Sequence, residues 1–474
     1  MFFAVAMTGT AMAQLQGVSS SKASFMLPKL AGVTTKSLLT VGDSIGGYRM
    51  VGIPDGMGAL KNSNGFVEAF MNHELGPTAG SVRAHGSAGS FVSKWVINPT
   101  THEVVAGSDL ITNVAGISGG AAPFARFCSS DLAAKSAFFN ATTGRGTQER
   151  IYLTGEETGA EGRAFGTMVT GANSGTAYYL PSLGKFNWEN AVAHYNTGDK
   201  TIVAGTDDST PGEMYFYEGT KTATGNDMMK AGLVGGRTLG LKLNGVLSET
   251  AGSGAAPTAF SFADLGDAAT MSGADLQAAS TAAGVTKFAR PEDIHWDPTN
   301  RNVAYVATTG SSASGSKLWK MTFNNVDDLM SGGFMEAVLD TSDGIRSLDN
   351  LTVDKNGNVV VQEDPGNNSR LAKIWRYTGS NGALDLVAEA DPTLFLTGAS
   401  GFLTQDEETS GIIDASDLLG EGWYLMSMQV HRPLGGELVQ DGQMIAMYMP
   451  VPEPASMTVL GLGLVAMMRK RKKN

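Results

Sequence analysis

Pairs of acidic residues recur along the chain beside short apolar segments. Glu156 and Glu157, for example, follow residues 150–154 (RIYLT). The comparable acidic segments are His73-Glu74, Glu156-Glu157, Asp207-Asp208, Glu292-Asp293, Asp349-Asn350, Glu363-Asp364 and Asp406-Glu407-Glu408. One such pair alone is typical of a solvated turn, but clustered carboxylates stay ionised only when cations offset their charge. Because carboxylate and amide oxygens are ligands for hard cations, the recurrence predicts a shared calcium or magnesium site.

Short strands bounded by Gly, Asn, Asp, Ser and Thr must position these residues. Predicted strands include 91–97, 150–154, 201–205, 213–219, 303–309, 317–323, 358–364, 373–379 and 422–428. Several form consecutive pairs, and this repetition favours an all-β fold, a β-propeller of about five to seven blades, in which strand ends converge on a central funnel. A β-sandwich or β-helix is the alternative. Residues 264–283 are the main helical candidate and are predicted to be an insertion.

The composition limits the classes of partner. The chain has 474 residues, with 34 Lys and Arg against 46 Asp and Glu, which gives a net charge of −12. This excess of acid argues against nucleic acid as a partner, because such partners require a basic surface. The single cysteine, Cys128, excludes an internal disulfide and leaves a buried thiol, a reactive thiol or a metal ligand open.

The two ends of the chain are predicted to be targeting segments around a folded body of residues 14–450. Residues 1–13 are apolar and end in Ala11-Met12-Ala13, which is typical of a signal peptide. The basic region that normally begins a signal peptide is missing, which indicates a longer signal peptide or a misassigned start codon.

Residues 451–474 contain Pro452-Glu453-Pro454, a short apolar run and a basic tail at 469–473. The apolar run is shorter than the roughly 20 residues of a stable membrane span. This order resembles the PEP-CTERM sorting signal of Gram-negative bacteria. The resemblance implies export, processing by an exosortase-type sorting protease, transient membrane association through the tail until it is processed, and a final place at the cell surface or in the extracellular matrix.

The order of motifs in the body resembles the PhoX-type alkaline phosphatases, a family of secreted β-propeller proteins. The matching segments are 72–75 (NHEL), 153–157 (LTGEE), 184–191 (GKFNWENA), 205–219, 288–309 and 348–364. The resemblance implies phosphomonoester hydrolysis at a centre that combines calcium with iron. In such a centre a metal-activated water, hydroxide or oxide attacks the phosphorus in line. Residues 404–431 are more similar to secreted relatives without an assigned activity.

The resemblance also implies which residues form the site. The implied metal ligands are Glu156, Glu157, Glu292, Asp349, Asn350, Glu363 and Asp364, with Asp207 as a further acidic candidate. Glu189 stands where the family tends to have a His-Glu pair, but Trp188 precedes it here. Cys128 lies 28 residues before Glu156 in the context RFCSSDLA, whereas the family's iron-binding cysteine lies in Cys-Ala-Gly-Gly.

Two arginines are candidates for contact with the phosphoryl group. Arg290 precedes the proline of RPE and could bind a phosphate oxygen in a bidentate manner, or pair with a neighbouring carboxylate. Arg346 could offset charge on the transferred group. The alternative function is a non-catalytic, calcium-stabilised propeller that binds matrix polysaccharide or another surface protein. A hydrolase of another phosphoester, such as phytate or a diester, is a third reading.

Overall fold

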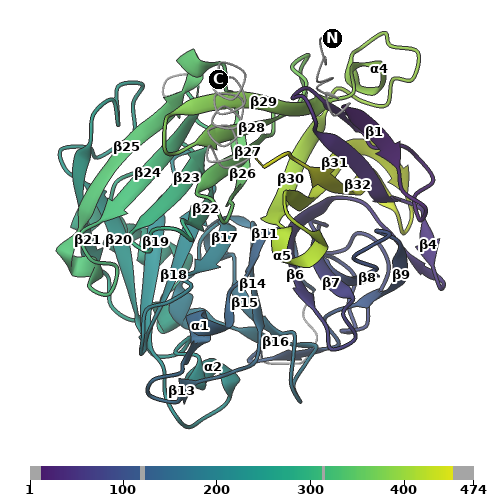
Figure 1. Ribbon diagram of the computed structural model, residues 1–474. Helices are drawn as coiled ribbons and strands as arrows, with labels where there is room; N and C mark the ends of the chain where they lie inside the picture. Colours follow the sequence, from purple (N-terminus) through teal and green to yellow (C-terminus); the bar gives the residue numbers. More distant parts are fainter. Residues whose placement is uncertain (1–11, 118–122, 312–314, 452–474) are drawn as a thin grey trace, which may run out of the picture.

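A computed structural model describes residues 12–117, 123–311 and 315–451, and within them the strands form six blades around a central axis (Figure 1). Blades 1 to 3 contain β6 (Pro54–Lys61), β7 (Val67–His73), β8 (Phe91–Ile97) and β9 (Val104–Asp109); β11 (Phe127–Leu132), β14 (Ile151–Glu156), β15 (Ala164–Met168) and β16 (Thr176–Tyr179); and β17 (Trp188–Ala193), β18 (Lys200–Asp207), β19 (Met214–Thr220) and β20 (Arg237–Leu243). Blades 4 to 6 contain β22 (Pro291–Trp296), β23 (Val303–Thr308), β24 (Lys317–Phe323) and β25 (Gly333–Asp340); β26 (Leu348–Val353), β27 (Asn358–Glu363), β28 (Lys373–Thr378) and β29 (Ala383–Ala390); and β30 (Glu407–Asp414), β31 (Trp423–Gly435), β32 (Val439–Tyr448) and β3 (Thr34–Thr40).

The ring of blades is closed. The inner strands β6, β11, β17, β22, β26 and β30 each pack against the next one, and β30 packs against β6. The N-terminal strand β3 pairs with β32 and so completes blade 6. The preceding strand β2 (Met26–Pro28) pairs with β29 at the outer edge of blade 5, and β1 (Ala13–Gln16) pairs with β3. The N-terminal segment therefore joins the last two blades.

The propeller prediction is confirmed, and the closed ring rules out a sandwich or a β-helix. Each strand expected from the sequence is present, and the expected hairpins β23–β24 and β27–β28 pair in the antiparallel sense. Blades 3 and 4 share one sheet, because β21 (Thr258–Asp264) pairs with both β20 and β25. The predicted helical insertion contains α3 (Gly273–Ala283), which begins at the capping residue Ser272 and ends at Gly284, whose φ is 70°. The remaining short elements are α1 (Lys135–Phe138), α2 (Asp227–Lys230), α4 (Pro392–Phe395) and α5 (Ser416–Leu419), with β4 (Ser44–Ile45), β5 (Tyr48–Arg49), β10 (Asn113–Ala115), β12 (Phe139–Asn140) and β13 (Arg145–Gly146).

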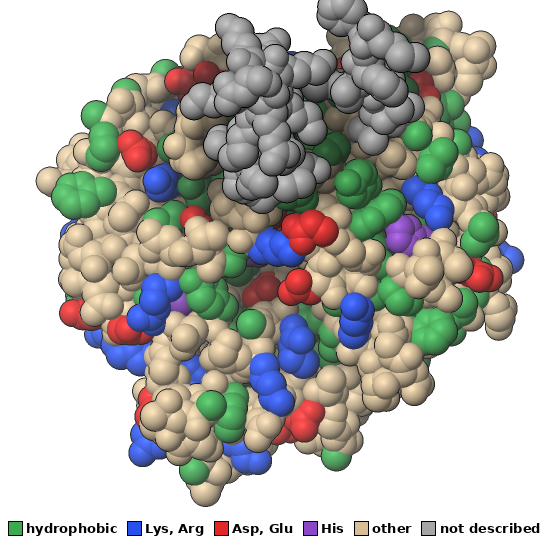
Figure 2. All heavy atoms as spheres, viewed as in Figure 1, with side chains coloured by type: hydrophobic (Ala, Val, Ile, Leu, Met, Phe, Trp, Pro, Cys, Tyr) green, Lys and Arg blue, Asp and Glu red, His purple; other side chains and the backbone are tan. Residues whose placement is uncertain are grey.

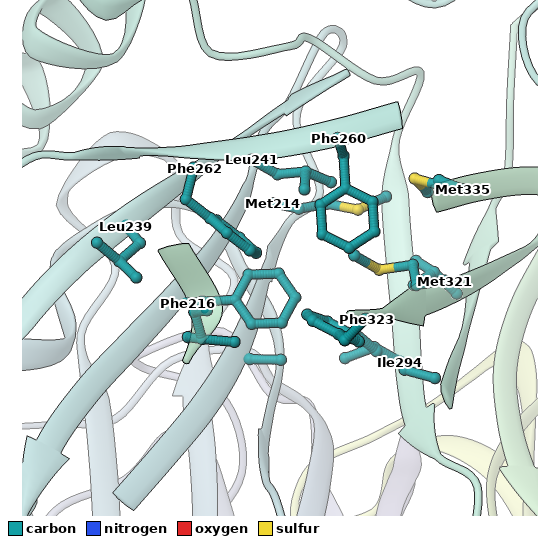
Figure 3. Close-up of a cluster of buried hydrophobic side chains, with 14 of the residues drawn as sticks. Met214, Phe216, Leu239, Leu241, Phe260, Phe262, Ile294, Met321, Phe323 and Met335 are labelled. Atoms are coloured by element: carbon teal, nitrogen blue, oxygen red, sulfur yellow. The ribbon is translucent and has the colours of Figure 1, made fainter. Parts of the chain in front are cut away.

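Hydrophobic side chains fill the space between neighbouring blades. Figure 3 shows the cluster between blades 3 and 4, where Phe216 meets Phe262 and Phe323 in edge-to-face contacts at 5.0 and 5.8 Å. Burial of one such side chain stabilises the fold by about 1.5–3 kcal/mol. Comparable clusters lie between the other blades, so each inner strand is held from both sides.

The inner strands of blades 1 to 5 share a β-bulge near their first residue. The two bulged residues in each are Asp55-Gly56, Cys128-Ser129, Glu189-Asn190, Glu292-Asp293 and Asp349-Asn350. In blade 6 Glu408 pairs regularly with Gln429, and the register shift follows at Ser410. A bulge bends the strand and re-aims a side chain. Here it turns the first residue of each pair toward the axis.

A second repeated feature precedes each bulge. In four blades the residue two positions before the first bulged residue has a left-handed backbone: Ile53, Arg126, Arg290 and Ser347 have φ values of 51°, 46°, 56° and 45°. Such conformations cost on the order of 1–3 kcal/mol each in non-glycine residues and gather at functional sites. Their recurrence at one position of the repeat shows that the strain belongs to the architecture of the axis.

Most of each predicted targeting segment falls outside the described residues. Residues 1–11 and 452–474 are not described, and Ala13, the last residue of the predicted signal peptide, is the first residue of β1. Among the described residues, no helix has the length and apolar character needed to span a membrane.

Candidate metal centre

A polar cavity of about 200 Å3, which we call the funnel, lies where the inner strands converge. Figure 2 shows acidic and basic side chains around a hollow near the centre of this face. The lining residues are Glu74, Arg126, Cys128, Glu157, Glu189, Asp208, Arg290, Glu292, Asp349, Asp364, Glu408 and His431. Every one of them occupies one of three positions that repeat from blade to blade.

The first position, the inner ring, is the start of each inner strand. Its members, in blade order, are Asp55, Cys128, Glu189, Glu292, Asp349 and Glu408. All six are buried. Five are carboxylates, so the axis of the propeller carries a closely packed set of negative charges.

The second position, the middle ring, directly follows the second strand of each blade, or for His431 lies within it. Its members are Glu74, Glu157, Asp208, Thr309, Asp364 and His431. The third position, the rim, lies two residues before the inner ring. Its members are Ile53, Arg126, Asn187, Arg290, Ser347 and Asp406. In every blade the backbone N–H of the middle-ring residue donates to the carbonyl oxygen of the rim residue at 2.8–3.1 Å, which fixes the two positions relative to each other.

The acidic groups form a continuous arc of candidate cation sites. Ligand atoms lie within 4.8 Å of one another in each of four overlapping groups: Asp55, Glu74 and Cys128; Cys128, Glu157 and Glu189; Glu189, Glu292 and Asp349; Asp349, Asp364 and Glu408. Atoms at this spacing can coordinate one ion. Because each group shares a residue with the next, neighbouring ions would share ligands.

Burial and mutual repulsion make the carboxylates hard to ionise without cations. Burial, reinforced by Glu74, raises the pKa of Glu157 from 4.5 to about 8, and burial with Glu408 raises that of Asp364 from 3.8 to about 7. Burial raises the pKa of Glu189 well above its usual range, and Glu292 adds to this effect. The buried atoms Glu189 Oε1 and Asp55 Oδ1 have no hydrogen-bond partner within the described residues. Buried polar atoms without partners are costly, so these oxygens fit metal coordination.

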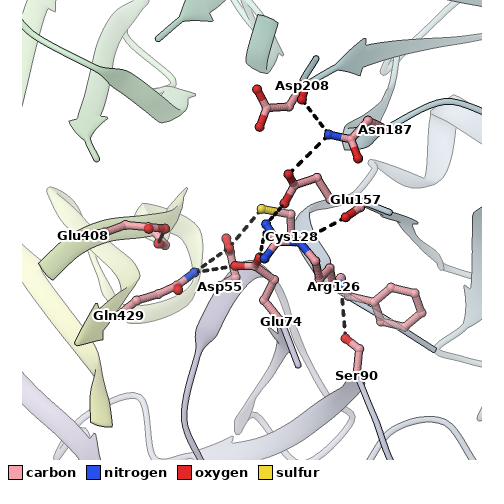
Figure 4. Close-up of polar contacts among 12 residues, drawn as sticks. Asp55, Glu74, Ser90, Arg126, Cys128, Glu157, Asn187, Asp208, Glu408 and Gln429 are labelled. Atoms are coloured by element: carbon pink, nitrogen blue, oxygen red, sulfur yellow. Dashed lines mark hydrogen bonds and ion pairs between the residues drawn. The ribbon is translucent and has the colours of Figure 1, made fainter. Parts of the chain in front are cut away.

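Two rim arginines partly offset this charge, and Figure 4 shows the contacts of one of them, Arg126. Arg126 donates to Glu74 Oε1 at 2.7 Å and also to Glu157. Arg290 binds Asp208 in a bidentate manner, with distances of 2.7 and 2.9 Å, and its Nη2 lies 3.2 Å from Glu292 Oε1. Each arginine thus joins the middle-ring acid of the preceding blade to an acid of its own blade.

Cys128 and His431 are the remaining lining groups. Cys128 Sγ lies 3.3 Å from Asp55 Oδ2, and burial, with Asp55 nearby, raises the pKa of the thiol. His431 Nε2 lies 3.4 Å from Glu408 Oε2 and its Nδ1 lies 2.7 Å from Gln440 Oε1. Burial disfavours the imidazolium, but the hydrogen bond and the charge of Glu408 outweigh it and raise the pKa of His431 to about 10.

The structure brings only some of the predicted site residues together. Those that line the funnel are Cys128, Glu157, Glu189, Arg290, Glu292, Asp349 and Asp364. Glu156 and Glu363 face the other way, because successive residues of a strand point to opposite sides. Glu156 binds Arg163 at 2.5 and 2.6 Å, and Glu363 binds Arg370 at 2.6 and 2.9 Å.

Three other predicted residues also lie outside the funnel lining. Asp207 accepts a hydrogen bond from Ser209 Oγ at 2.7 Å. Asn350 is the second residue of its bulge and donates to Ser129 Oγ at 3.1 Å. Arg346 lines a separate cavity beside the funnel, where its Nη1 donates to the carbonyl oxygen of Thr341 at 2.6 Å.

Sequence reasoning did not select several residues of the funnel lining and of the candidate cation sites. Glu74, Asp208 and Glu408 belong to acidic segments that it noted, whereas Asp55 and Arg126 belong to none. A usable signal exists at the start of the inner strands: an acid or cysteine, then a small or polar residue. This pattern occurs as Asp55-Gly56, Cys128-Ser129, Glu189-Asn190, Glu292-Asp293 and Asp349-Asn350.

Comparison with solved structures agrees with the fold. PhoX from Pseudomonas fluorescens, solved in complex with vanadate, a transition state analogue, superposes with a TM-score of 0.63 and 14% sequence identity, over 91% of this chain and 98% of that one. The NanB sialidase from Streptococcus pneumoniae reaches a TM-score of only 0.39 at 9% identity, over 89% and 70% of the two chains. No curated protein matches the chain.

Two family models match the sequence. The PEP-CTERM protein-sorting motif matches residues 450–472, which identifies the chain as one that is exported and sorted by an exosortase-type protease. The alkaline phosphatase PhoX model matches residues 144–411, which is more than half of the 474 residues and includes most of the inner, middle and rim positions. The chain therefore belongs to the PhoX family of alkaline phosphatases, which are metal-dependent hydrolases of phosphoric monoesters.

Proposed function

We propose that phosphomonoester hydrolysis takes place in the funnel, on cations held by the inner and middle rings. The observation that carries this proposal is the arc of four overlapping ligand groups, which brings carboxylates from all six blades and one thiol into a single cavity. A purely structural role for the acids would not account for buried oxygens that have no partner among the described residues, such as Glu189 Oε1.

The donor types favour two kinds of metal. Glu189, Glu292, Asp349, Asp364 and Glu408 offer only oxygen atoms and suit calcium. The group of Asp55, Glu74 and Cys128 includes a sulfur, which favours a transition metal such as iron. The thiol must lose its proton on binding, because burial, with Asp55 nearby, raises the pKa of Cys128 and favours the protonated thiol in the metal-free site.

Bound cations would supply an activated water and neutralise charge on the phosphoryl oxygens. In the reaction the water oxygen bonds to phosphorus, the bond from phosphorus to the alcohol oxygen breaks, and the alcohol oxygen takes up a proton. Arg290 and Arg126 point their guanidinium groups into the funnel from the rim. Their Nε and Nη2 atoms bind neighbouring acids and backbone, whereas Nη1 of each has no hydrogen-bond partner among the described residues and fits contact with an oxygen of the transferred group.

The setting of the protein is part of the same proposal. Residues 1–13 would direct export as a signal peptide, and residues 451–474 would tether the chain to the membrane until the tail is processed. Residues 14–450 would form the propeller at the surface or in the matrix of a Gram-negative bacterium. Millimolar calcium outside the cell would fill the oxygen-lined groups. Phosphomonoesters outside the cell would be the substrates.

The test is hydrolysis of a generic phosphomonoester by the exported protein, with calcium and after chelation, together with metal analysis. We expect activity that chelation abolishes and that Glu292→Gln lowers at least about a hundredfold, since loss of one charge-stabilising group commonly has an effect of this size. Glu421→Gln is the control, because Glu421 is exposed and pairs with Lys355. Bound calcium without any phosphatase activity would instead mean a structural cation site in a surface-binding propeller.

A further inference from the structure

The sixfold pattern of the funnel has one neutral sector. Thr309 is the only middle-ring residue that is neither acidic nor a histidine, and the rim residue of the next blade, Ser347, is also uncharged. At the equivalent places Arg126 binds Glu74 and Arg290 binds Asp208. Between blades 4 and 5, the middle ring and the rim therefore have no charged side chain at these two positions.

A cavity of about 480 Å3 opens at this neutral sector, and we call it the side pocket. Its polar lining consists of Thr309, Ser311, Ser316, Thr341, Arg346 and Ser347, and none of the described residues that line it is a carboxylate. Thr309 lines the side pocket and also donates through Oγ1 to the inner-ring residue Glu292. The side pocket and the funnel are thus one side chain apart.

One position in the wall of the side pocket requires glycine. Gly310 has a φ of 88°, and a Cβ at this residue would lie 2.1 Å from the carbonyl oxygen of Gly315. A side chain at residue 310 would therefore displace the backbone that lines the pocket. Arg346 is exposed, and its Nη1 donates to the carbonyl oxygens of Thr341 and Ile345, both at 2.6 Å. Its Nε and Nη2 donate no hydrogen bond within the described residues, so they can bind a ligand.

We infer that the side pocket binds the alcohol portion of the substrate, and that Arg346 selects phosphomonoesters whose alcohol carries a second anionic group. This inference rests on the proposed function, which places the phosphoryl group in the funnel. With the phosphoryl group in the funnel, the alcohol of the ester can extend past Thr309 into the side pocket without passing a carboxylate of the middle ring or the rim. Hydroxyl groups along this path suit a hydroxylated alcohol. The single guanidinium suits a carboxylate or a second phosphate at its far end.

The test compares two esters that differ in one group. Phosphoglycerate and glycerol phosphate share the phosphoryl ester, but the first has a carboxylate where the second has a hydroxymethyl group. We expect the unaltered protein to favour phosphoglycerate in kcat/KM. Arg346→Ala should lower kcat/KM for phosphoglycerate about tenfold more than for glycerol phosphate, because one charge-assisted contact corresponds to roughly this factor. Arg346→Lys should restore part of the preference.

The control is Arg145→Ala, which removes an exposed arginine of β13 that pairs with Asp199, the residue before β18. Equal kcat/KM for the two esters, unchanged by Arg346→Ala, would overturn the inference and leave the proposed function intact. If neither ester is hydrolysed, the proposed function fails. Calorimetric titration with phosphoglycerate then decides the side pocket alone: binding weakened about tenfold by Arg346→Ala supports it, and equal binding refutes it.

Discussion

Glu156 and Glu157 are neighbours in the chain, yet they lie on opposite sides of the blade wall. Glu157 lines the funnel beside Arg126, whereas Glu156 forms a bidentate ion pair with Arg163 and accepts a hydrogen bond from the backbone N–H of Ala125. Glu363 repeats this arrangement in blade 5 with Arg370 and the backbone N–H of Arg346. In both pairs, Glu156-Glu157 and Glu363-Asp364, the first carboxylate forms an ion pair that stabilises the blade and the second lines the funnel.

This division predicts opposite effects for two similar substitutions. Glu157→Gln should lower phosphatase activity and cation content with little change in thermal stability. Glu156→Gln should reduce the free energy of unfolding by about 2 kcal/mol, because it removes the charge that binds Arg163, while the folded fraction keeps its activity. Thermal denaturation and assays on the same preparations measure both effects. Loss of bound calcium in Glu156→Gln alone would contradict the assignment.

Removal of cations should make stability depend on pH. In the metal-free protein the pKa of Glu157 is about 8 and that of Asp364 about 7, compared with 4.5 and 3.8 when unshifted. Between these values the folded state binds more protons than the unfolded state, so the free energy of unfolding decreases as pH rises. The stability that the two protonated groups contribute is fully present below about pH 4 and is lost as pH rises through about 8. We expect the melting temperature of the chelated protein to fall across this range, and calcium to reverse the fall. A flat profile after chelation would argue against the acidic cluster as the cause.

Cys128 should determine the kind of metal bound and not the total amount. Replacement by serine keeps the volume but removes the soft sulfur ligand beside Asp55. Cys128→Ser should therefore lower iron content while calcium content stays the same, as measured by elemental analysis. Because Cys128 is buried, a melting curve of the variant must accompany the measurement. Iron absent from the unaltered protein would refute an iron site.

Arg290 should be sensitive to a change that preserves its charge. Lysine cannot reproduce the bidentate contacts of the guanidinium, so Arg290→Lys should lower kcat/KM for a phosphomonoester by about tenfold or more. The matched control is Arg301→Lys, which alters a comparable bidentate pair with Asp327 on the outer surface. Steady-state kinetics decide the matter. Equal losses in both variants would mean that Arg290 acts through stability alone.

The sequence was sufficient for the architecture because strand signals are local. Alternating apolar residues and Gly- or Asn-rich turns determine each hairpin without reference to the rest of the chain, and β24 matches its expected range residue for residue. The closure of blade 6 by β3 could not be predicted, since it depends on a pairing between residues near the two ends of the chain.

Prediction of the funnel was limited by side-chain direction. The acidic segments were visible, but the choice between Glu156 and Glu157 depends on where β14 ends and on which face each residue points. Asp55 has no acidic neighbour in sequence and joins the candidate cation site with Glu74 and Cys128 only because a bulge turns it toward the axis. Arg126 likewise depends on its left-handed backbone, for which the sequence has no strong signal.

The closure of the ring by strands from both ends of the chain also makes the funnel depend on an intact chain. Asp55 and Glu74 come from the first blade, whereas Glu408 and His431 come from the last. The candidate ligands surround one axis only when β30 of the last blade packs against β6 of the first. A chain truncated within either blade therefore lacks part of the ligand set. The last strand of the ring, β32, ends at Tyr448, just before the matched sorting motif at residues 450–472.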